Sequence, residues 1–139
     1  AKPDVVCIAQ LPFRREAIAE FCAQHLMRPL TVVSDGLDCF AVASGAGVHE
    51  RIVTGGGKAA ARHPEFQAVN TMLSNLKTAL TGTYHAFKFS KYAQRYLAEF
   101  QYRFNRRRDM AAMLGEMVVG MLHAKPAHMA LIRRPEACC

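Results

Sequence analysis

Hydrophobic positions predict short buried strands and an amphipathic helix in the first half of the chain. Residues 4–11 (DVVCIAQL) and 30–34 (LTVVS) are near-continuous apolar runs rich in β-branched side chains, which is typical of buried strands. Residues 14–27 carry apolar side chains at helical spacing and are followed by Pro29, so they predict a helix. Residues 37–46 predict a further short helix, and residues 48–53 a short strand.

Longer helices are predicted in the second half. Pro64 and Glu65 open a helix, because proline fits the first helical turn and an acid complements the helix dipole. Gly82 ends it, and Ser90 caps a second helix that reaches about Arg107 and continues, broken, to Leu122. The predicted apolar stripe of the first long helix comprises Phe66, Val69, Leu73, Leu76 and Leu80.

The order strand, helix, strand, then helices indicates an α/β fold. A chain of 139 residues is long enough for one domain with a core, although two or three strands make a small sheet. We therefore expect part of a larger α/β domain over residues 1–125, followed by a short mobile tail over residues 126–139.

The formal net charge of +7 favours a polyanionic partner, with nucleic acid the commonest and acidic proteins or anionic membranes as alternatives. Five cysteines without CxxC spacing indicate reduced thiols in a cytoplasmic protein, and no zinc-ligand spacing is present. No apolar run is long enough to span a membrane, and the first residues do not resemble a signal peptide.

Polar side chains with the potential for chemistry lie on a strand end and on one helix. Asp35 follows the second predicted strand, where open α/β sheets place functional groups, although an ordinary Asp-Gly turn explains it equally well. Asn70, Ser74 and Lys77 share a helix face, where an amide oxygen suits Mg²⁺ or Mn²⁺ and a lysine suits a phosphate. The alternative is a solvated helix face. Asp38 is interpreted as a solvated or helix-start acid.

The helix after Ser90 is basic and aromatic. Tyr92, Tyr96, Phe100 and Phe104 form a stripe that we interpret as core. The arginines between and after them are suited to phosphate contacts or, alternatively, to a solubilising face. This basic cluster comprises Arg95, Arg103, Arg106, Arg107 and Arg108.

Two further motifs are incomplete. Gly55-Gly56-Gly57-Lys58 lacks the GxxxxGK[ST] frame of a phosphate loop and is interpreted as a mobile loop. Ser34 with His49, His63 or His85 lacks the GxSxG elbow of a hydrolase.

Four segments together resemble bacterial insertion-sequence transposases of the DDE class, in the subgroup whose third catalytic acid is replaced by asparagine. They are Ser34-Asp35-Gly36, Val69-Asn70 with Asn75-Leu76-Lys77, residues 82–87 (GTYHAF) and residues 95–107 (RYLAEFQYRFNRR). The likeness covers roughly residues 14–122.

The resemblance implies an RNase H-like catalytic domain that cuts and joins DNA at insertion-sequence ends with two divalent metals, Mg²⁺ or Mn²⁺. It implies Asp35 as the second acid, Asn70 as the third metal ligand and Lys77 as a DNA-contacting lysine. DNA is the implied partner, and a homo-oligomer is compatible with it.

The chain departs from the family pattern before Asp35. Only 34 residues precede Asp35, and their single aspartate, Asp4, lies in no matching context. We therefore expect the C-terminal part of a partial RNase H-like fold, with the N-terminal strands missing and residues 4–11 as the last strand of a missing hairpin. The expected function is DNA binding without catalysis by this chain alone. The alternative is a non-enzymatic interaction or dimerisation module. For an independent nuclease or hydrolase, the sequence contains no complete set of catalytic residues.

Overall fold

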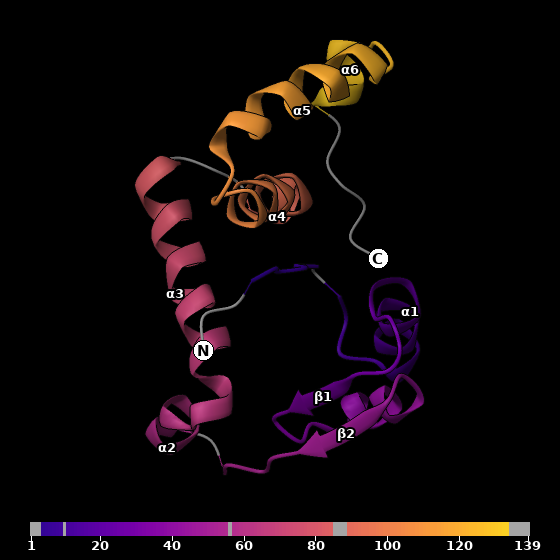
Figure 1. Cartoon of the computed structure of the whole chain (residues 1–139), viewed down its shortest axis with the longest axis vertical. Coiled ribbons are helices and arrows are strands. Elements are labelled where there is room, and N and C mark those ends of the chain that lie inside the picture. Colours follow the sequence, from indigo (N-terminus) through magenta and orange to yellow (C-terminus); the bar gives the residue numbers. More distant parts are fainter. Residues whose placement is uncertain (1–3, 10, 56, 85–88, 134–139) are drawn as a thin grey trace. The chain divides into compact units, whose positions relative to one another are not determined.

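The computed structural model describes residues 4–9, 11–55, 57–84 and 89–133 (Figure 1). The chain is mixed α/β, mostly helical with a two-stranded sheet, and divides into two units. Within the described residues, the first unit holds residues 11–75 and the second holds residues 4–9 and 76–133. Of the helices described, none combines the length and apolar character needed to cross a membrane.

The core of the first unit lies between α1 (Arg15–His25) and the 3-10 helix η1 (Asp38–Gly45). Both helices follow the predicted patterns, and η1 is tighter than an α-helix. Their small apolar side chains pack against one another. No large side chain of these two helices is fully buried. The buried cluster comprises Ile18, Cys22, Cys39, Ala43 and Ala46.

The sheet pairs β1 (Thr31–Ser34) with β2 (Val48–Arg51) in parallel, which confirms both strand predictions. Thr31 pairs with Val48 and Ser34 with Arg51, and η1 forms the connection between the strands. Gly47 precedes β2 at a point where the two backbones approach closely. A Cβ atom on Gly47 would lie 2.1 Å from the Leu30 carbonyl oxygen, so only glycine fits there.

The short helix α2 (Gly57–Arg62) leads into the long helix α3 (Pro64–Thr83). Pro64 begins α3 as predicted, whereas the helix includes Gly82 and continues one residue beyond it.

The predicted apolar stripe of α3 is partly wrong. Val69 and Leu73 are 55% and 48% exposed, while Met72 and Leu76 are buried. Because the helix carries apolar residues on more than one face, spacing alone did not select the buried one.

Three helices make up most of the second unit: α4 (Phe89–Asn105), α5 (Met110–His123) and α6 (Met129–Ile132). The break that was predicted after Arg107 is real, and Asp109 caps α5 by accepting a hydrogen bond from the Ala112 amide at 2.9 Å. Ser90 was predicted as the N-cap of α4, but the helix already begins at Phe89. The backbone of Tyr92 departs from helical geometry, with φ −134° and ψ 22°.

The buried face of α4 also differs from the predicted aromatic stripe. Ala93 and Leu97 are 3% and 4% exposed, whereas Tyr92 and Tyr96 are only half-buried. Small and branched side chains therefore occupy the centre of this face, and the tyrosines flank it.

The strand predicted over residues 4–11 is wrong for the described residues 4–9 and 11, which belong to no sheet. Residues 4–9 nevertheless show extended features. The backbone amide of Val6 donates to Asn105 Oδ1 at 2.8 Å, and that of Ile8 donates to Gln101 Oε1 at 2.7 Å. Residues two apart face the same partner only along an extended backbone. Side chains of α4 thus satisfy this segment where a neighbouring strand was expected.

Two predicted features fall partly or wholly outside the described residues. Residues 85–87 of the GTYHAF motif and residues 134–139 of the predicted tail lie there, while α6 forms within residues 126–133. The mixed α/β class is confirmed. The RNase H-like fold stays a prediction.

Candidate functional site

Asp35 lies immediately after β1, at the carboxyl end of a parallel strand. Its side chain is exposed, and Oδ1 accepts a hydrogen bond from the Leu37 amide at 3.2 Å. This Asx-type turn fixes the carboxylate beside its own backbone. Among the described residues, no hydrogen bond reaches Oδ2, so one oxygen is available to a ligand.

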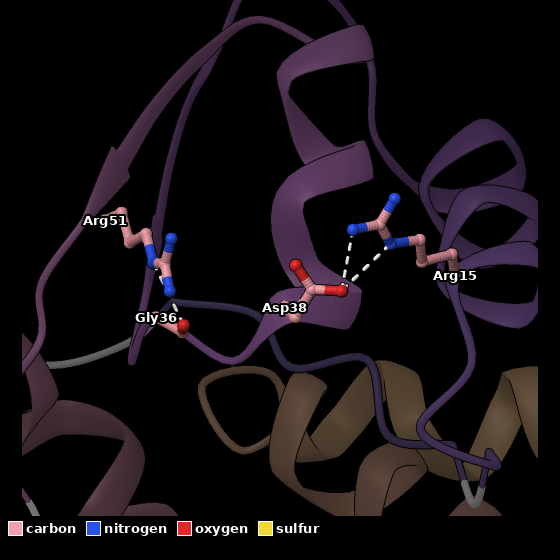
Figure 2. A network of polar contacts seen from close by, with 4 residues as sticks. All are labelled: Arg15, Gly36, Asp38 and Arg51. Atoms are coloured by element: carbon pink, nitrogen blue, oxygen red, sulfur yellow. Dashed lines mark hydrogen bonds and ion pairs between the residues drawn. The ribbon is translucent and has the colours of Figure 1, made fainter.

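Gly36 and Arg51 hold the turn that follows Asp35 (Figure 2). Gly36 has φ +87°, a conformation that favours glycine, and Arg51 Nε donates to its carbonyl oxygen at 2.9 Å. A Cβ atom on Gly36 would also lie 2.9 Å from Val53 Cγ2. The geometry of this turn therefore explains the glycine of the Ser-Asp-Gly motif, independently of any chemical role of Asp35.

Ser34 and His49 form a hydrogen bond across the sheet, with 2.9 Å between Oγ and Nε2. Ser34 is buried, and its Oγ is also 3.4 Å from the backbone amide of Gly36, which donates to it. No carboxylate of the described part of the chain bonds the other ring nitrogen of His49. The pair therefore stabilises the strand end and lacks the orienting acid that a serine hydrolase uses.

Asp38 is the acid closest in sequence to Asp35, but it already has a cationic partner. Arg15 binds Asp38 Oδ2 through Nη2 at 2.6 Å and through Nε at 3.1 Å (Figure 2). Both side chains are more than half exposed, so the pair stabilises the fold only weakly. The sequence offered no sign of this pairing, because Arg15 is on another helix.

Asn70 and Lys77 both lie on α3, as predicted, but their environments differ. Asn70 is half-buried, and its Nδ2 donates to the Ala61 carbonyl oxygen at 3.1 Å. No described group donates to its Oδ1, which is the atom that would bind a metal. Lys77 is exposed and forms no ion pair with any described residue.

The basic cluster on α4 and just after it is largely occupied by intramolecular partners. Arg103 pairs with Glu99 at 2.8 Å, one helical turn away. Arg106 pairs with Glu116 of α5 and lies over the Tyr102 ring, 4.1 Å from its centroid.

The remaining arginines bind backbone carbonyls and the N-terminal segment. Arg107 donates to the Asp4 carbonyl oxygen at 3.1 Å and lies over the Phe104 ring. Arg108 pairs with the Asp4 carboxylate at 2.7 Å, and Arg95 donates to the Ile132 carbonyl oxygen. A phosphate would therefore have to compete with these groups.

The residues do not fit a two-metal centre by themselves. Such a centre needs a carboxylate that bridges both ions, in addition to ligands on each side. Asp35 supplies one free oxygen and Asn70 a neutral one, and no described contact joins the two residues. Within the described part of the chain, no group of three histidine, cysteine, aspartate or glutamate side chains could hold a metal ion.

Gln101 and Asn105 are structurally important residues that sequence analysis did not single out. Their side chains bind the backbone of residues 6 and 8. Their spacing of four residues on one helix face is the only signal that the sequence carries.

Comparison of the sequence with known protein families finds one matching family model. Residues 4–105 match the family model described as the ISXO2-like transposase domain. The match begins at the extended segment and ends at the last residue of α4. No curated protein and no solved structure matches the chain significantly.

Proposed function

The chain belongs to the family of ISXO2-like transposase domains, and we propose that it binds DNA as part of a DDE-class transposase without cutting DNA alone. The observation that carries the proposal is the family match over residues 4–105, which spans Asp35, Asn70 and Lys77. The family supports transposition of insertion sequences as the process and DNA as the partner.

Asp35 and Asn70 are the proposed metal ligands, for Mg²⁺ or Mn²⁺, in a complete active site. Support comes from the Oδ2 of Asp35 at a strand end and from the Oδ1 of Asn70, neither of which accepts a hydrogen bond from the described residues. Because these two groups are too few for a two-metal centre, no strand-transfer step is assigned to this chain.

Lys77 is the proposed first contact with the DNA backbone. Its exposed ammonium forms no ion pair with the described part of the chain, so it can bind a phosphate without giving up such a contact. The proposed secondary contacts are Arg95, Arg103, Arg106 and Arg107, which would exchange their present partners for phosphates.

The direct test combines DNA binding with DNA cleavage. A fluorescently labelled duplex is titrated with the full chain at several salt concentrations, and we expect affinity to fall as salt rises, because bound phosphates release counterions. Supercoiled plasmid incubated with the chain and Mg²⁺ or Mn²⁺ should stay intact. Salt-insensitive or absent DNA binding contradicts the proposed DNA contact, and metal-dependent cleavage that Asp35→Ala abolishes contradicts the proposed inactivity.

A further inference from the structure

Arg51 is an exposed arginine at the carboxyl end of β2, close to the candidate site. It pairs with Ser34 across the parallel sheet, and Asp35 follows Ser34 in the chain. The two strands therefore end side by side, so that Arg51 and Asp35 lie at the same edge of the sheet. In open α/β sheets this edge, formed by the carboxyl ends of the strands, is where ligands bind.

The guanidinium of Arg51 is held by the turn that follows Asp35 (Figure 2). Its Nε donates to the Gly36 carbonyl oxygen at 2.9 Å, and a Cβ atom on Gly36 would lie only 3.1 Å from Nε. An arginine carries five N–H donors, and this contact uses only the one on Nε. The donors on Nη1 and Nη2 form no hydrogen bond with the described residues, so they are available to a ligand.

No acidic side chain of the described residues neutralises the charge of Arg51. Asp35 forms no ion pair with it, and Asp38 pairs with Arg15 instead (Figure 2). Glu50 precedes Arg51 in β2, but successive side chains of a strand point to opposite faces. The edge of the sheet therefore carries a positive charge that this part of the chain does not compensate.

Arg28 makes a comparable contact at the opposite end of the same sheet. It is exposed, and its Nη2 donates to the Gly45 carbonyl oxygen. Arg28 and Gly45 precede β1 and β2 respectively, at the amino ends of the strands. A hydrogen bond from an arginine to a carbonyl oxygen is therefore no sign of ligand binding by itself. What distinguishes Arg51 is its position at the same edge as Asp35.

We propose that Arg51 binds a phosphate of the DNA backbone at the carboxyl end of β2, beside Asp35. This contact rests on the DNA binding proposed above and adds to it a residue of the first unit. The donors on Nη1 and Nη2 form a planar fork that fits two oxygens of one phosphate, while Nε keeps its bond to Gly36. Because that bond already orders the side chain, less conformational freedom is lost when the phosphate binds. Arg51 thus directs the DNA backbone to the edge of the sheet where Asp35 lies.

The test is DNA binding by the full chain with Arg51→Gln, measured with a labelled duplex at several salt concentrations. The glutamine amide nitrogen is as many bonds from the backbone as Nε of arginine, so it can donate to Gly36, but it lacks the charge and the fork. We expect affinity to fall about three- to tenfold and the slope of log affinity against log salt to decrease by about 0.9, as for one lost phosphate contact. Arg51→Ala, which also loses the bond to Gly36, should bind DNA no better than Arg51→Gln.

Arg28→Gln is the matched control. It removes the same charge from an exposed arginine at the other end of the sheet, and it should change affinity by less than about twofold, because salt screens a distant charge. Circular dichroism and urea denaturation report whether each variant is folded. If Arg51→Gln loses no more affinity than Arg28→Gln, the role of Arg51 is wrong while the proposed DNA binding stands. If the unaltered chain shows no salt-sensitive DNA binding, both are wrong.

A second measurement needs no variant. Phenylglyoxal modifies exposed guanidinium groups, and mass spectrometry of the digested chain gives the rate at each arginine. Bound duplex should slow the modification of Arg51 and leave that of Arg28 unchanged, since only the fork of Arg51 is covered by a phosphate. Equal rates at Arg51 with and without bound DNA would overturn the proposal.

Discussion

Asn105 binds both backbone groups of Val6, a residue 99 positions earlier in the chain. The Val6 amide donates to Asn105 Oδ1 at 2.8 Å, and Asn105 Nδ2 donates to the Val6 carbonyl oxygen at 2.9 Å. This is the pair of hydrogen bonds that a neighbouring strand would provide, formed by one side chain. Within the second unit, the asparagine therefore takes the place of a neighbouring strand and holds residues 4–9 to α4.

Asn105→Ala should destabilise the chain by about 1–3 kcal/mol, because two partly buried backbone groups lose their partner. Urea denaturation followed by circular dichroism measures the change. Asn75→Ala is the matched control: Asn75 is an exposed α3 residue with no side-chain hydrogen bond to the described residues, so its loss should change the free energy of unfolding by less than about 0.5 kcal/mol. Equal effects of the two substitutions would contradict the proposed importance of the Val6 contact.

Lys77→Ala should weaken DNA binding and reduce the slope of log affinity against log salt by about 0.9, the value expected for one lost phosphate contact. Fluorescence anisotropy with a labelled duplex measures both quantities. Lys125→Ala removes the same charge from an exposed position outside the family match and serves as the control. An unchanged slope for Lys77→Ala would exclude the lysine from the DNA contact.

Glu116→Gln should increase DNA affinity, because it releases Arg106 from its ion pair and leaves the guanidinium free for a phosphate. Since both side chains are partly exposed, the gain should be modest, about two- to fivefold. Glu65→Gln makes the same change in net charge at an exposed residue without a described ion pair. If both variants gain equally, net charge alone explains the effect and Arg106 has no specific role.

Gly47→Ala should cost about 2 kcal/mol or more of stability, because the added Cβ meets the Leu30 carbonyl oxygen that accepts the first hydrogen bond of β2. Thermal or urea denaturation measures it. Gly45→Ala, where a Cβ meets no atom within 4 Å, should be neutral or slightly stabilising. A Gly47→Ala chain as stable as the Gly45→Ala chain would show that the backbones of β1 and β2 are not so close.

The stability of the first unit should fall as pH rises past about 9. Burial raises the pKa of the Cys22 thiol above its ordinary value of 9.0. In the unfolded chain the thiol loses its proton at the ordinary value, whereas the folded chain retains it to higher pH, so alkaline conditions favour unfolding. Comparison of unfolding free energies between pH 7 and 10 should show a steeper decline for the unaltered chain than for Cys22→Ala. Parallel curves would contradict this role of Cys22.

Sequence patterns predicted those elements whose partners are close along the chain. The helix α1, the strands β1 and β2 and the start of α3 at Pro64 all follow from local spacing and from proline or glycine positions. The strand prediction for residues 4–9 was wrong because the hydrogen-bond partners of this segment are side chains almost a hundred residues away in the sequence. A strand-like pattern predicts an extended backbone correctly, but it cannot identify what satisfies that backbone.

In the candidate site, too, local features could be predicted from the sequence, whereas contacts between separate elements could not. Asp35 was correctly placed at a strand end, since the apolar run before it defines the strand. The pairing of Asp38 with Arg15 and the bond from Asn70 to Ala61 depend on how helices pack, and no local pattern encodes them. The arginine cluster was recognised from composition, yet its acidic partners Asp4 and Glu116 became visible only in three dimensions.

The attachment of residues 4–9 to α4 also has a consequence for the order of folding. During synthesis the N-terminal segment leaves the ribosome long before Gln101 and Asn105 are made, whereas α1, η1 and the sheet need no residue beyond β2 to form their contacts. Contacts between residues far apart in sequence form slowly, because a long loop must close first. The first unit can therefore fold while the chain is still growing, and the second unit must wait until nearly all of it has emerged.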